Sequence, residues 1–187
     1  RFGVNAGNSI ESGGNYNVVV GDEAGTAITT GDANVAVGYK ALFTEDANGQ
    51  NVAVGYNSLM TLNAGAEGNN VAVGFKAGEL VTTGIQNTLI GALAGDALTD
   101  ADFNTALGFQ ALSAAITSDG NTAIGRYALL SDTQGNLNVA VGRDALRAQN
   151  MGSDIDSYNT AVGALAGTAV TTGVQNVLIG GLAGDSL

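Results

Sequence analysis

Apolar and polar positions along the chain follow a unit, N-x-A-x-G-x-x-A-[L/G], that restarts every 17 residues at most steps. Position 1 is Asn and position 5 is Gly in all ten full copies, and position 8 is Ala in nine of them. Positions 2 to 4 form a short apolar segment such as Val35-Ala36-Val37. The two invariant columns consist of Asn17 and Gly21, Asn34 and Gly38, Asn51 and Gly55, Asn70 and Gly74, Asn87 and Gly91, Asn104 and Gly108, Asn121 and Gly125, Asn138 and Gly142, Asn159 and Gly163, and Asn176 and Gly180. A period this regular indicates stacked repeat units.

A unit of 17 residues is too short for a helix pair and fits one solenoid turn with two short strands and two corners. We expect the first strand at segments such as Val35-Ala36-Val37 and the second at segments such as Tyr39-Lys40-Ala41-Leu42. The Gly between them should permit a bend or a positive φ, or let another backbone approach closely. The pattern therefore predicts an all-β parallel β-solenoid (β-roll) of about eleven coils, the first incomplete.

The solenoid is expected to be one domain over residues 1–187, and a fragment of a longer chain because the repeat is already under way at Arg1 and still running at Leu187. Two coils are longer than the others, with two extra residues after Asn51 and four after Asn138. These insertions fall in the variable part of the coil, where Gly, Asp and Thr are frequent. We expect them to bulge outward and to leave the stack intact.

The first strand of each coil has no polar face, because positions 2, 3 and 4 are all apolar or Thr. A strand with one wet face would alternate apolar and polar residues. We therefore expect one face to fill the coil interior, and the other, small and flat with Ala, to pack on a neighbouring chain or another layer. A homotrimer around the fibre axis satisfies this arrangement; a monomer that tolerates the Ala face at its surface is the alternative.

The Asn at position 1 of each coil predicts a structural feature. Stacked identical Asn side chains can form an amide ladder in which each bonds the coils above and below. Such a ladder would satisfy buried amides at one corner of the coil. A structural role for the ten Asn residues is favoured over a ligand-binding one.

Charge and composition limit the partners. The 17 acids and 6 bases give a net charge of −11, which disfavours nucleic acid and anionic lipid as partners. Cys and His are absent, so thiolate sites and Ser-His-Asp or Cys-His catalysis are impossible within this chain. No run of 18 apolar residues occurs, and we expect no membrane span in this fragment. No cofactor is expected.

Acidic residues offer few candidate sites. The pairs Asp22/Glu23, Glu45/Asp46, Asp100/Asp102 and Asp154/Asp156 lie in different loops, and we expect them to be solvated turn residues rather than a glycosidase pair. Asp154 and Asp156 remain a weak calcium candidate, because they supply oxygen ligands two residues apart in the longest loop.

Basic and aromatic residues gather just after the repeat Gly. Lys40, Lys76, Arg126, Arg143 and Arg147 all lie within five residues of it, which predicts a column of positive charge on one edge. We expect these bases to pair with loop acids such as Glu79, Asp96 or Asp144; a groove for acidic sugars is the alternative.

An aromatic column runs beside them. Tyr39, Tyr56 and Phe75 share one column in three successive coils, and Phe109 occupies it two coils later. Such a stack is usually packing and can also bind carbohydrate. Tyr39, Tyr56, Phe75, Arg126 and Arg143 are therefore the possible ligand surface.

The repeat resembles a known family. Asn34-Val35-Ala36-Val37-Gly38 and Asn121-Thr122-Ala123-Ile124-Gly125 are similar to the S-V-A-I-G and N-T-A-I-G repeats of YadA-like trimeric autotransporter heads, and to related repeats of bacteriophage tail fibres. The resemblance implies a trimeric β-roll with the small apolar strand near the threefold axis, and a role in adhesion and receptor binding without catalytic residues. This chain repeats at 17 residues, where the autotransporter heads repeat at about fourteen.

The resulting hypothesis is a non-catalytic structural or adhesive fibre segment, extracellular on a cell surface or virion, that gives a rigid rod and contacts a host receptor or surface glycan. The alternatives are an ice-binding solenoid and a glycan-binding or glycan-processing one. Ice binding would need Thr arrays across consecutive coils, whereas Thr29/Thr30, Thr82/Thr83 and Thr171/Thr172 recur sparsely.

Overall fold

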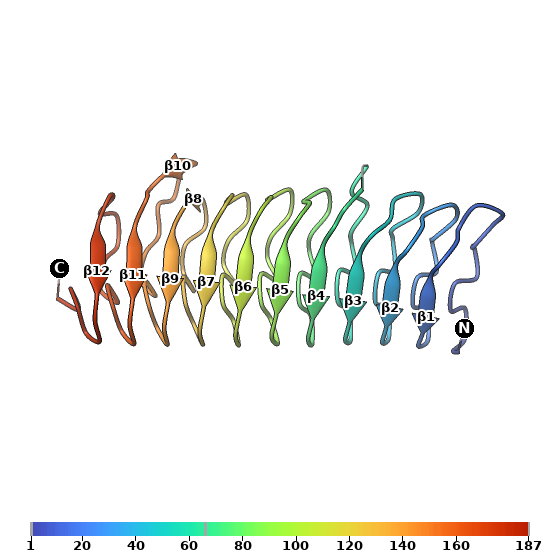
Figure 1. Ribbon diagram of the computed structural model, residues 1–187, viewed down its shortest axis with the longest axis horizontal. Helices are drawn as coiled ribbons and strands as arrows, with labels where there is room; N and C mark the ends of the chain where they lie inside the picture. The colour runs from blue at the N-terminus through green and yellow to red at the C-terminus, as the bar shows by residue number, and fades with distance from the viewer. Residues whose placement is uncertain (1, 66, 187) are drawn as a thin grey trace.

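The computed structural model describes residues 2–65 and 67–186, which form a parallel β-solenoid with one main sheet running its whole length (Figure 1). The ten strands of this sheet lie side by side in chain order, one in each coil. They are β1 (Val18–Val20), β2 (Val35–Val37), β3 (Val52–Val54), β4 (Val71–Val73), β5 (Thr88–Ile90), β6 (Thr105–Leu107), β7 (Thr122–Ile124), β9 (Val139–Val141), β11 (Thr160–Val162) and β12 (Val177–Ile179). The predicted fold class and coil length are confirmed.

Adjacent coils are in register, position for position. Val35 pairs with Val52 and Ala36 with Ala53, for example, and the same alignment holds at all nine steps of the sheet. Before β1, Phe2 forms an isolated parallel bridge with Val20, as the incomplete first unit predicts. Identical side chains therefore stand above one another about 4.8 Å apart, so that each repeat position becomes a continuous column along the molecule.

The predicted second strand is not present: residues 39–42 and their equivalents form turns. Two positions of this segment adopt left-handed φ values, for example 51° at both Lys40 and Leu42. Hydrogen bonds between coils hold the turn, since Leu42 N donates to Ser58 O at 3.0 Å and Lys40 N donates to Asp22 O at 3.1 Å. The backbone amides are thus satisfied by the stack without an extended segment, which makes an otherwise unfavourable conformation stable here.

The strands point their central residue inward, so the expectation that Ala packs on a neighbouring chain was wrong. Position 3 is fully buried in the interior coils, as at Ala36 and Ala106, while Val35 and Val37 on either side are half-buried and face outward. The interior behind the Ala column is filled by large side chains of positions 9 and 12, among them Leu42, Leu59, Leu112, Leu129, Leu146, Leu62, Val81 and Leu98. The outward face of the sheet therefore consists of Val, Ile, Leu and Thr.

The Asn column forms a buried ladder. At every step the side-chain Oδ1 of one Asn accepts a hydrogen bond from the backbone N–H of the next Asn in the column. For example, Asn121 N donates to Asn104 Oδ1 at 2.9 Å. The Nδ2 group mostly donates to a carbonyl 14 residues onward in the same coil, such as Ser118 O at 2.8 Å from Asn104. Direct amide–amide bonds also occur, for example between Asn104 Nδ2 and Asn87 Oδ1 at 3.1 Å. The predicted ladder is confirmed, with the backbone as its main partner.

Both insertions leave the sheet unbroken, as predicted. Val52 of β3 still pairs with Val71 of β4, and Val139 of β9 still pairs with Thr160 of β11. The longer insertion adds the short strand β10 (Ile155–Asp156), which pairs with β8 (Gly135–Asn136) and projects from one edge of the solenoid (Figure 1).

Candidate functional site

The outward strand face is wider than the three-residue strands. Exposure alternates along each coil: positions 1 and 3 are buried in the interior coils, whereas the residue before Asn and positions 2, 4 and 6 are half-buried or exposed. The residues before Asn are Tyr16, Ala33, Gln50, Asn69, Gln86, Phe103, Gly120, Leu137, Tyr158 and Gln175. Those at position 6 are Asp22, Tyr39, Tyr56, Phe75, Ala92, Phe109, Arg126, Arg143, Ala164 and Gly181. We define the strand face as these two columns together with positions 2 and 4.

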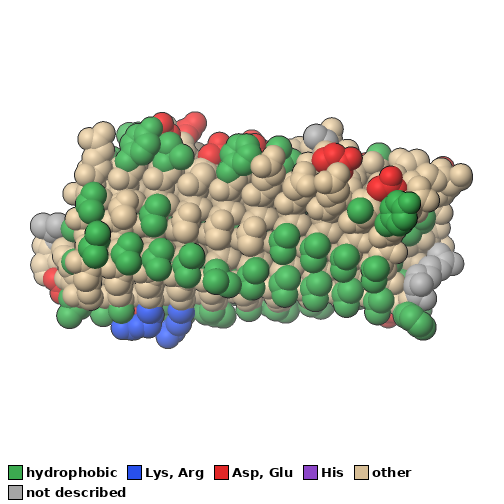
Figure 2. Space-filling model, in the orientation of Figure 1, with side chains coloured by type: hydrophobic (Ala, Val, Ile, Leu, Met, Phe, Trp, Pro, Cys, Tyr) green, Lys and Arg blue, Asp and Glu red, His purple; other side chains and the backbone are tan. Residues whose placement is uncertain are grey.

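The strand face is almost free of charge. Of its forty positions, four in each of ten coils, only Asp22, Arg126 and Arg143 are charged, although the chain contains 17 acids and 6 bases. Figure 2 shows hydrophobic side chains along this face, most of the visible acidic ones along its upper edge, and basic ones projecting from its lower edge. Monomeric proteins rarely expose apolar patches beyond a few hundred Å².

The dimensions of the strand face match those of a protein interface. Nine steps between coils of about 4.8 Å give a length of about 43 Å. Six steps along the strand, from the residue before Asn to position 6, at about 3.3 Å each, give a width of about 20 Å. The product is about 860 Å², close to the roughly 800 Å² that each partner buries in a standard interface. The face is thus large enough to hold another chain.

The aromatic column is stacked as the sequence predicts. The ring centroids of Tyr39 and Tyr56 are 5.2 Å apart and those of Tyr56 and Phe75 are 5.4 Å apart, at interplanar angles of 25° and 17°. The three side chains remain between 40% and 49% exposed. They form a continuous flat aromatic strip at the edge where the strands end.

The basic residues follow the strand ends at three different repeat positions, and the predicted pairing with Glu79 and Asp144 is confirmed. Lys76 pairs with Glu79 at 3.0 Å, and Asp144 receives both Arg143 at 3.0 Å and Arg147 at 3.6 Å. Lys40 pairs with Glu23 of the preceding coil at 3.4 Å. The expected partner Asp96 instead accepts the Ser113 hydroxyl at 2.6 Å, and burial raises the pKa of its carboxyl.

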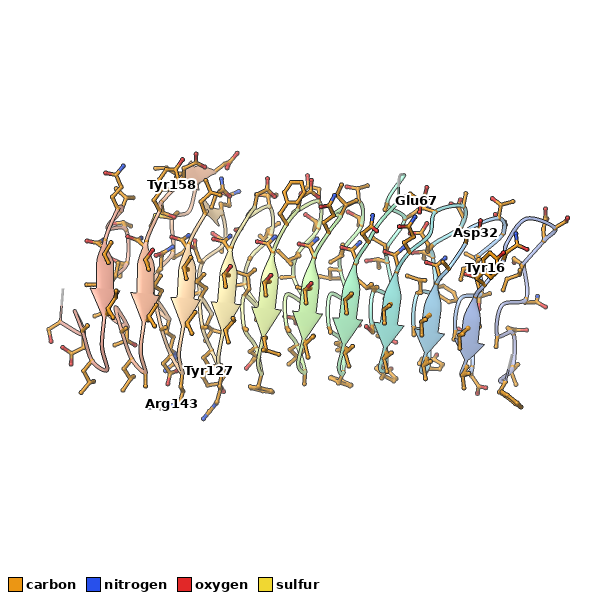
Figure 3. The ribbon with its side chains drawn as sticks, in the orientation of Figure 1. Tyr16, Asp32, Glu67, Tyr127, Arg143 and Tyr158 are labelled. Atoms are coloured by element: carbon orange, nitrogen blue, oxygen red, sulfur yellow. The ribbon has the colours of Figure 1, made fainter. Side chains whose placement is uncertain are left out.

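Arg126 and Arg143 are exposed just after the ends of β7 and β9 in successive coils, and Figure 3 shows Arg143 and Tyr127 at this edge. The guanidinium carbon of Arg126 is 4.3 Å from the Tyr127 ring centroid, and that of Arg147 is 5.3 Å from it. Among the described residues, no ion pair involves Arg126. Arg143 and Arg147 therefore share the carboxylate of Asp144, while Arg126 packs on the Tyr127 ring.

The opposite edge, where the strands begin, carries exposed acids. Asp32, Glu67 and Tyr158 mark this edge in Figure 3. In the long insertion, Asp154 Oδ1 and Asp156 Oδ1 both accept Asn136 Nδ2, at 2.7 and 3.3 Å. The Tyr158 hydroxyl also donates to Asp156 Oδ2 at 3.1 Å.

The calcium candidate gains no further ligand. Within residues 2–65 and 67–186, no three acids come together in a way that could hold a metal ion. Asp154 and Asp156 converge on an amide nitrogen, which is a hydrogen-bond donor and cannot coordinate a cation. These hydrogen bonds tie the inserted loop to Asn136.

Glu45 and Asp132 are buried, so the expectation of solvated turn acids was wrong for Glu45 of the Glu45/Asp46 pair. Each occupies position 12, where other coils have Ile, Leu, Val, Ala or Gln, and each stands in the coil just before an insertion. Glu45 accepts Ala64 N at 3.3 Å, and Asp132 accepts Met151 N at 3.1 Å. These donors lie in the inserted loops, whose extra residues break the regular hydrogen bonding between coils.

The pKa of Glu45 is raised above its usual value because burial disfavours the charged form, although bonds from Ala64 and Asn48 oppose the shift. A carboxyl group whose pKa is higher in the folded protein than in the unfolded chain stabilises the fold when it is protonated. This stabilisation is complete below the pKa of the unfolded chain, about 4.3, and is lost as pH rises through the pKa of the folded protein. Relative to Glu45→Gln, the wild type should therefore gain unfolding free energy as pH falls from 7 towards 4. Chemical denaturation at several pH values measures this slope. The exposed-site variant Glu67→Gln should show the same pH dependence of the unfolding free energy as the wild type. If Glu45→Gln also showed the wild-type pH dependence, the raised pKa of Glu45 would be contradicted.

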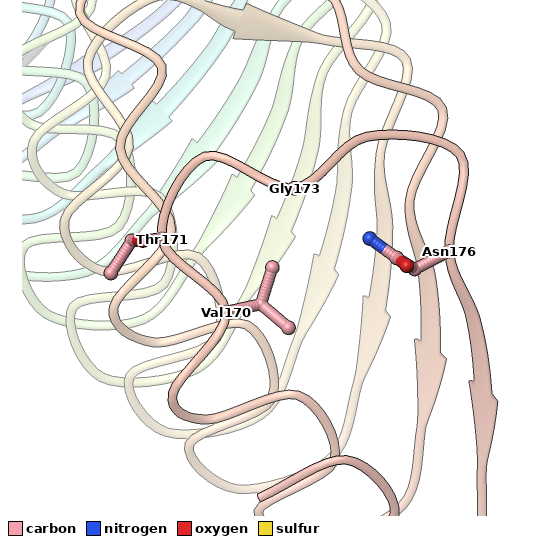
Figure 4. Close-up of a pocket in the computed structure, with 4 residues that line it drawn as sticks. All are labelled: Val170, Thr171, Gly173 and Asn176. Carbon is pink, nitrogen blue, oxygen red and sulfur yellow. The ribbon is translucent and has the colours of Figure 1, made fainter. Parts of the chain in front are cut away.

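A depression lined by Val170, Thr171, Gly173 and Asn176 lies beside the last strand (Figure 4). The equivalent residues of interior coils are covered by the following coil, as Val81 and Asn87 are. It is therefore the uncovered end of the stack rather than a cavity formed by converging side chains. No helix in the described part of the chain is long and apolar enough to cross a bilayer.

Comparison with known proteins gives no relative. No family model, no curated protein and no solved structure matches the chain significantly. The resemblance to autotransporter heads and phage tail fibres therefore rests on the repeat residues alone.

Proposed function

We propose that this chain is a non-catalytic structural segment of an extracellular fibre, on a cell surface or virion, that assembles as a homotrimer through its strand face. The observation that carries the proposal is the near absence of charge on that face. A chain with a net charge of −11 places only three charged residues on a surface of about 860 Å². Depletion of charge is the compositional signal of an interface core.

A ring of subunits around an axis parallel to the solenoid axis would cover this surface. The apolar columns run straight along the molecule, so subunits that face a common axis contact one another along their whole length. The repeat's resemblance to trimeric autotransporter heads and phage tail fibres supports three subunits. Such an assembly would be a rigid rod whose apolar face is covered.

Contact with a host receptor or surface glycan is the adhesive part of the proposal. The stacked rings of Tyr39, Tyr56 and Phe75 form a flat strip beside Lys40 and Lys76. Aromatic faces next to cationic groups can bind sugar rings that carry acidic substituents. This strip lies at the edge of the strand face, and its three side chains are between 40% and 49% exposed in the single chain.

The variant Val73→Asp tests the assembly surface. Val73 is the outward residue at position 4 of β4, so the substitution places a carboxylate in the proposed interface. We expect the trimer dissociation constant to rise at least about 100-fold, because an unpaired buried charge costs about 3 kcal/mol or more. Sedimentation velocity measures the change, and circular dichroism checks that the subunit remains folded.

The matched control is Thr83→Asp, which adds the same carboxylate to an exposed loop residue outside the strand face. This variant should sediment like the wild type. Equal trimer stability in Val73→Asp and the wild type would contradict the proposal, as would a wild type that is monomeric at every concentration.

A further inference from the structure

Three of the six basic residues lie together on two successive coils. Arg126 follows β7, and Arg143 and Arg147 follow β9 in the next coil. We call these three residues the arginine cluster. Positions 6 to 11 of these two coils, and of the coil on either side, contain one acid, Asp144. Three guanidinium groups and one carboxylate give this region a local charge of +2, in a chain whose net charge is −11. Figure 2 shows basic side chains gathered on this part of the lower edge.

Two groups of the same chain hold the arginines in place. The Asp144 side chain, only 7% exposed, pairs with Arg143 at 3.0 Å and with Arg147 at 3.6 Å. The Tyr127 ring centroid lies 4.3 Å from the guanidinium carbon of Arg126 and 5.3 Å from that of Arg147. Each guanidinium group carries five N–H donors, and these contacts use few of them. The Arg143 and Arg147 side chains are 54% and 51% exposed, so the remaining donors are ordered and open to solvent.

The two lysines on the same edge differ from the arginine cluster in their charge balance. Lys40 pairs with Glu23 at 3.4 Å and Lys76 pairs with Glu79 at 3.0 Å, which is one carboxylate for each ammonium group. The three arginines have one carboxylate between them, so positive charge remains in excess. Guanidinium groups also bind carboxylate, sulfate and phosphate oxygens through paired N–H donors. The arginine cluster is therefore the better of the two groups for holding an anion.

An exposed aromatic ring adjoins the arginine cluster. Phe109 occupies position 6 one coil before Arg126, and it is 44% exposed. Its ring meets the Tyr127 ring edge-on, with the centroids 5.6 Å apart. Position 6 thus presents an apolar ring and then the guanidinium groups of Arg126 and Arg143, at steps of about 4.8 Å. A sugar that carries an anionic substituent has the matching groups, since its C–H bonds pack on aromatic rings and its anion binds guanidinium groups.

The size of the arginine cluster favours a short anionic ligand over a large one. Nucleic acids and anionic membranes extend far beyond two coils, and the 17 acids of the chain repel them. A short oligosaccharide contacts the local positive charge alone, because charges are screened beyond about 8 Å at physiological ionic strength.

We propose that the arginine cluster and Phe109 form a binding site for an acidic oligosaccharide, whose carboxylate or sulfate groups contact the guanidinium groups while one sugar ring packs on Phe109. The site begins two coils beyond Phe75, the last ring of the aromatic strip, and is separate from that strip. It gives the adhesive role a second site with a ligand of defined class. It does not depend on the trimer, because every residue of the site belongs to one chain.

Isothermal titration calorimetry of the full chain with a sulfated heparin tetrasaccharide tests the site. Arg126→Gln with Arg143→Gln should raise the dissociation constant at least about tenfold, because charge-assisted hydrogen bonds are lost. The matched control is Thr83→Asp with Thr172→Asp, which changes the net charge equally at exposed loop residues and should stay within about threefold of the wild type. Neutral chitotetraose should bind at least about tenfold more weakly than the sulfated probe. A desulfated heparin tetrasaccharide then shows whether carboxylate or sulfate groups are bound.

Binding that is lost in the arginine variant and kept in the matched control supports the site. Equal loss in both would mean that binding follows overall charge, and would overturn the site. A wild type that does not bind the sulfated probe would overturn it as well. Loss in Lys40→Gln with Lys76→Gln, but not in the arginine variant, would place the ligand on the aromatic strip and overturn the site. Should the double arginine variant fail to fold, Arg126→Gln alone removes no ion pair among the described residues and must still weaken binding at least about threefold.

Sedimentation velocity on the same samples separates this site from the proposed trimer. A monomeric wild type whose binding depends on the arginines would contradict the trimer and leave the site standing. A trimeric wild type that does not bind the probe would do the reverse. If the arginine variant dissociated the trimer and bound the probe normally, the arginines would be subunit contacts and the site would be wrong.

Discussion

Gly91→Ala is expected to lower the free energy of unfolding by about 3 kcal/mol or more, through backbone strain and a steric clash together. Gly91 has a φ of 134°, which residues with a side chain rarely adopt. A Cβ at this position would lie 2.4 Å from the carbonyl oxygen of Gly108 in the next coil. That oxygen belongs to the stacked backbone and cannot move without separating the coils. Chemical denaturation monitored by circular dichroism measures the loss.

Gly180→Ala is the matched control for the clash. Gly180 has a similar φ of 124°, but a Cβ there would meet no atom within 4 Å. This variant should show only the conformational cost, about 1 to 3 kcal/mol. Equal destabilisation by the two substitutions would mean that the close approach of successive coils does not require the Gly column.

Asn104→Ala is expected to destabilise the fold by about 3 kcal/mol, because it leaves buried backbone groups without partners. Asn104 is 1% exposed, and its Oδ1 accepts the backbone N–H of Asn121 at 2.9 Å. Its Nδ2 donates to Ser118 O at 2.8 Å. Removing the amide therefore orphans one donor and one acceptor in adjacent coils. Equilibrium denaturation quantifies the change.

Asn63→Ala provides the comparison, since Asn63 is exposed in an inserted loop and is not part of the ladder. Its effect should be within about 0.5 kcal/mol of zero, as for most surface substitutions. A second variant, Asn104→Asp, keeps the acceptor but buries a carboxyl group that lacks a cationic partner. Its stability deficit should shrink as pH falls, because protonation removes the buried charge. A wild-type-like Asn104→Ala would contradict the structural role of the column.

The repeat was enough to predict the architecture and its invariant columns. The Gly and Asn positions recur at one place in every coil, and in-register stacking makes each of them touch its own copy. The orientation of the strand was not predictable in the same way. Val35, Ala36 and Val37 are apolar on both faces, so alternation gives no sign of which face is inside. The interior is narrow where Leu42 and its equivalents fill it, so position 3 is mostly the small Ala. The larger Val19 and Leu89 are buried at position 3 in coils whose position 9 is Gly.

The turn at residues 39–42 and the burial of the acids depend on contacts with neighbouring coils, so they could not be predicted from the sequence of a single coil. Left-handed φ values are sterically unfavourable for residues with a side chain, but intercoil hydrogen bonds stabilise them at Lys40 and Leu42. A sequence signal did exist for Glu45 and Asp132. Each replaces an apolar core residue in the coil that precedes an insertion. Comparing the residues at position 12 with the coil lengths would have identified both carboxylates as hydrogen-bond acceptors for backbone N–H groups of the inserted loops.

The molar mass of the wild-type chain in solution tests the central claim most directly. Light scattering over a dilution series should give three times 18.5 kDa, about 55.5 kDa, with dissociation only at low concentration. That result would mean that the uncharged strand face is covered by other copies of the chain. A stable mass of 18.5 kDa at every concentration would contradict it, because the strand face would then remain exposed to water in the native protein.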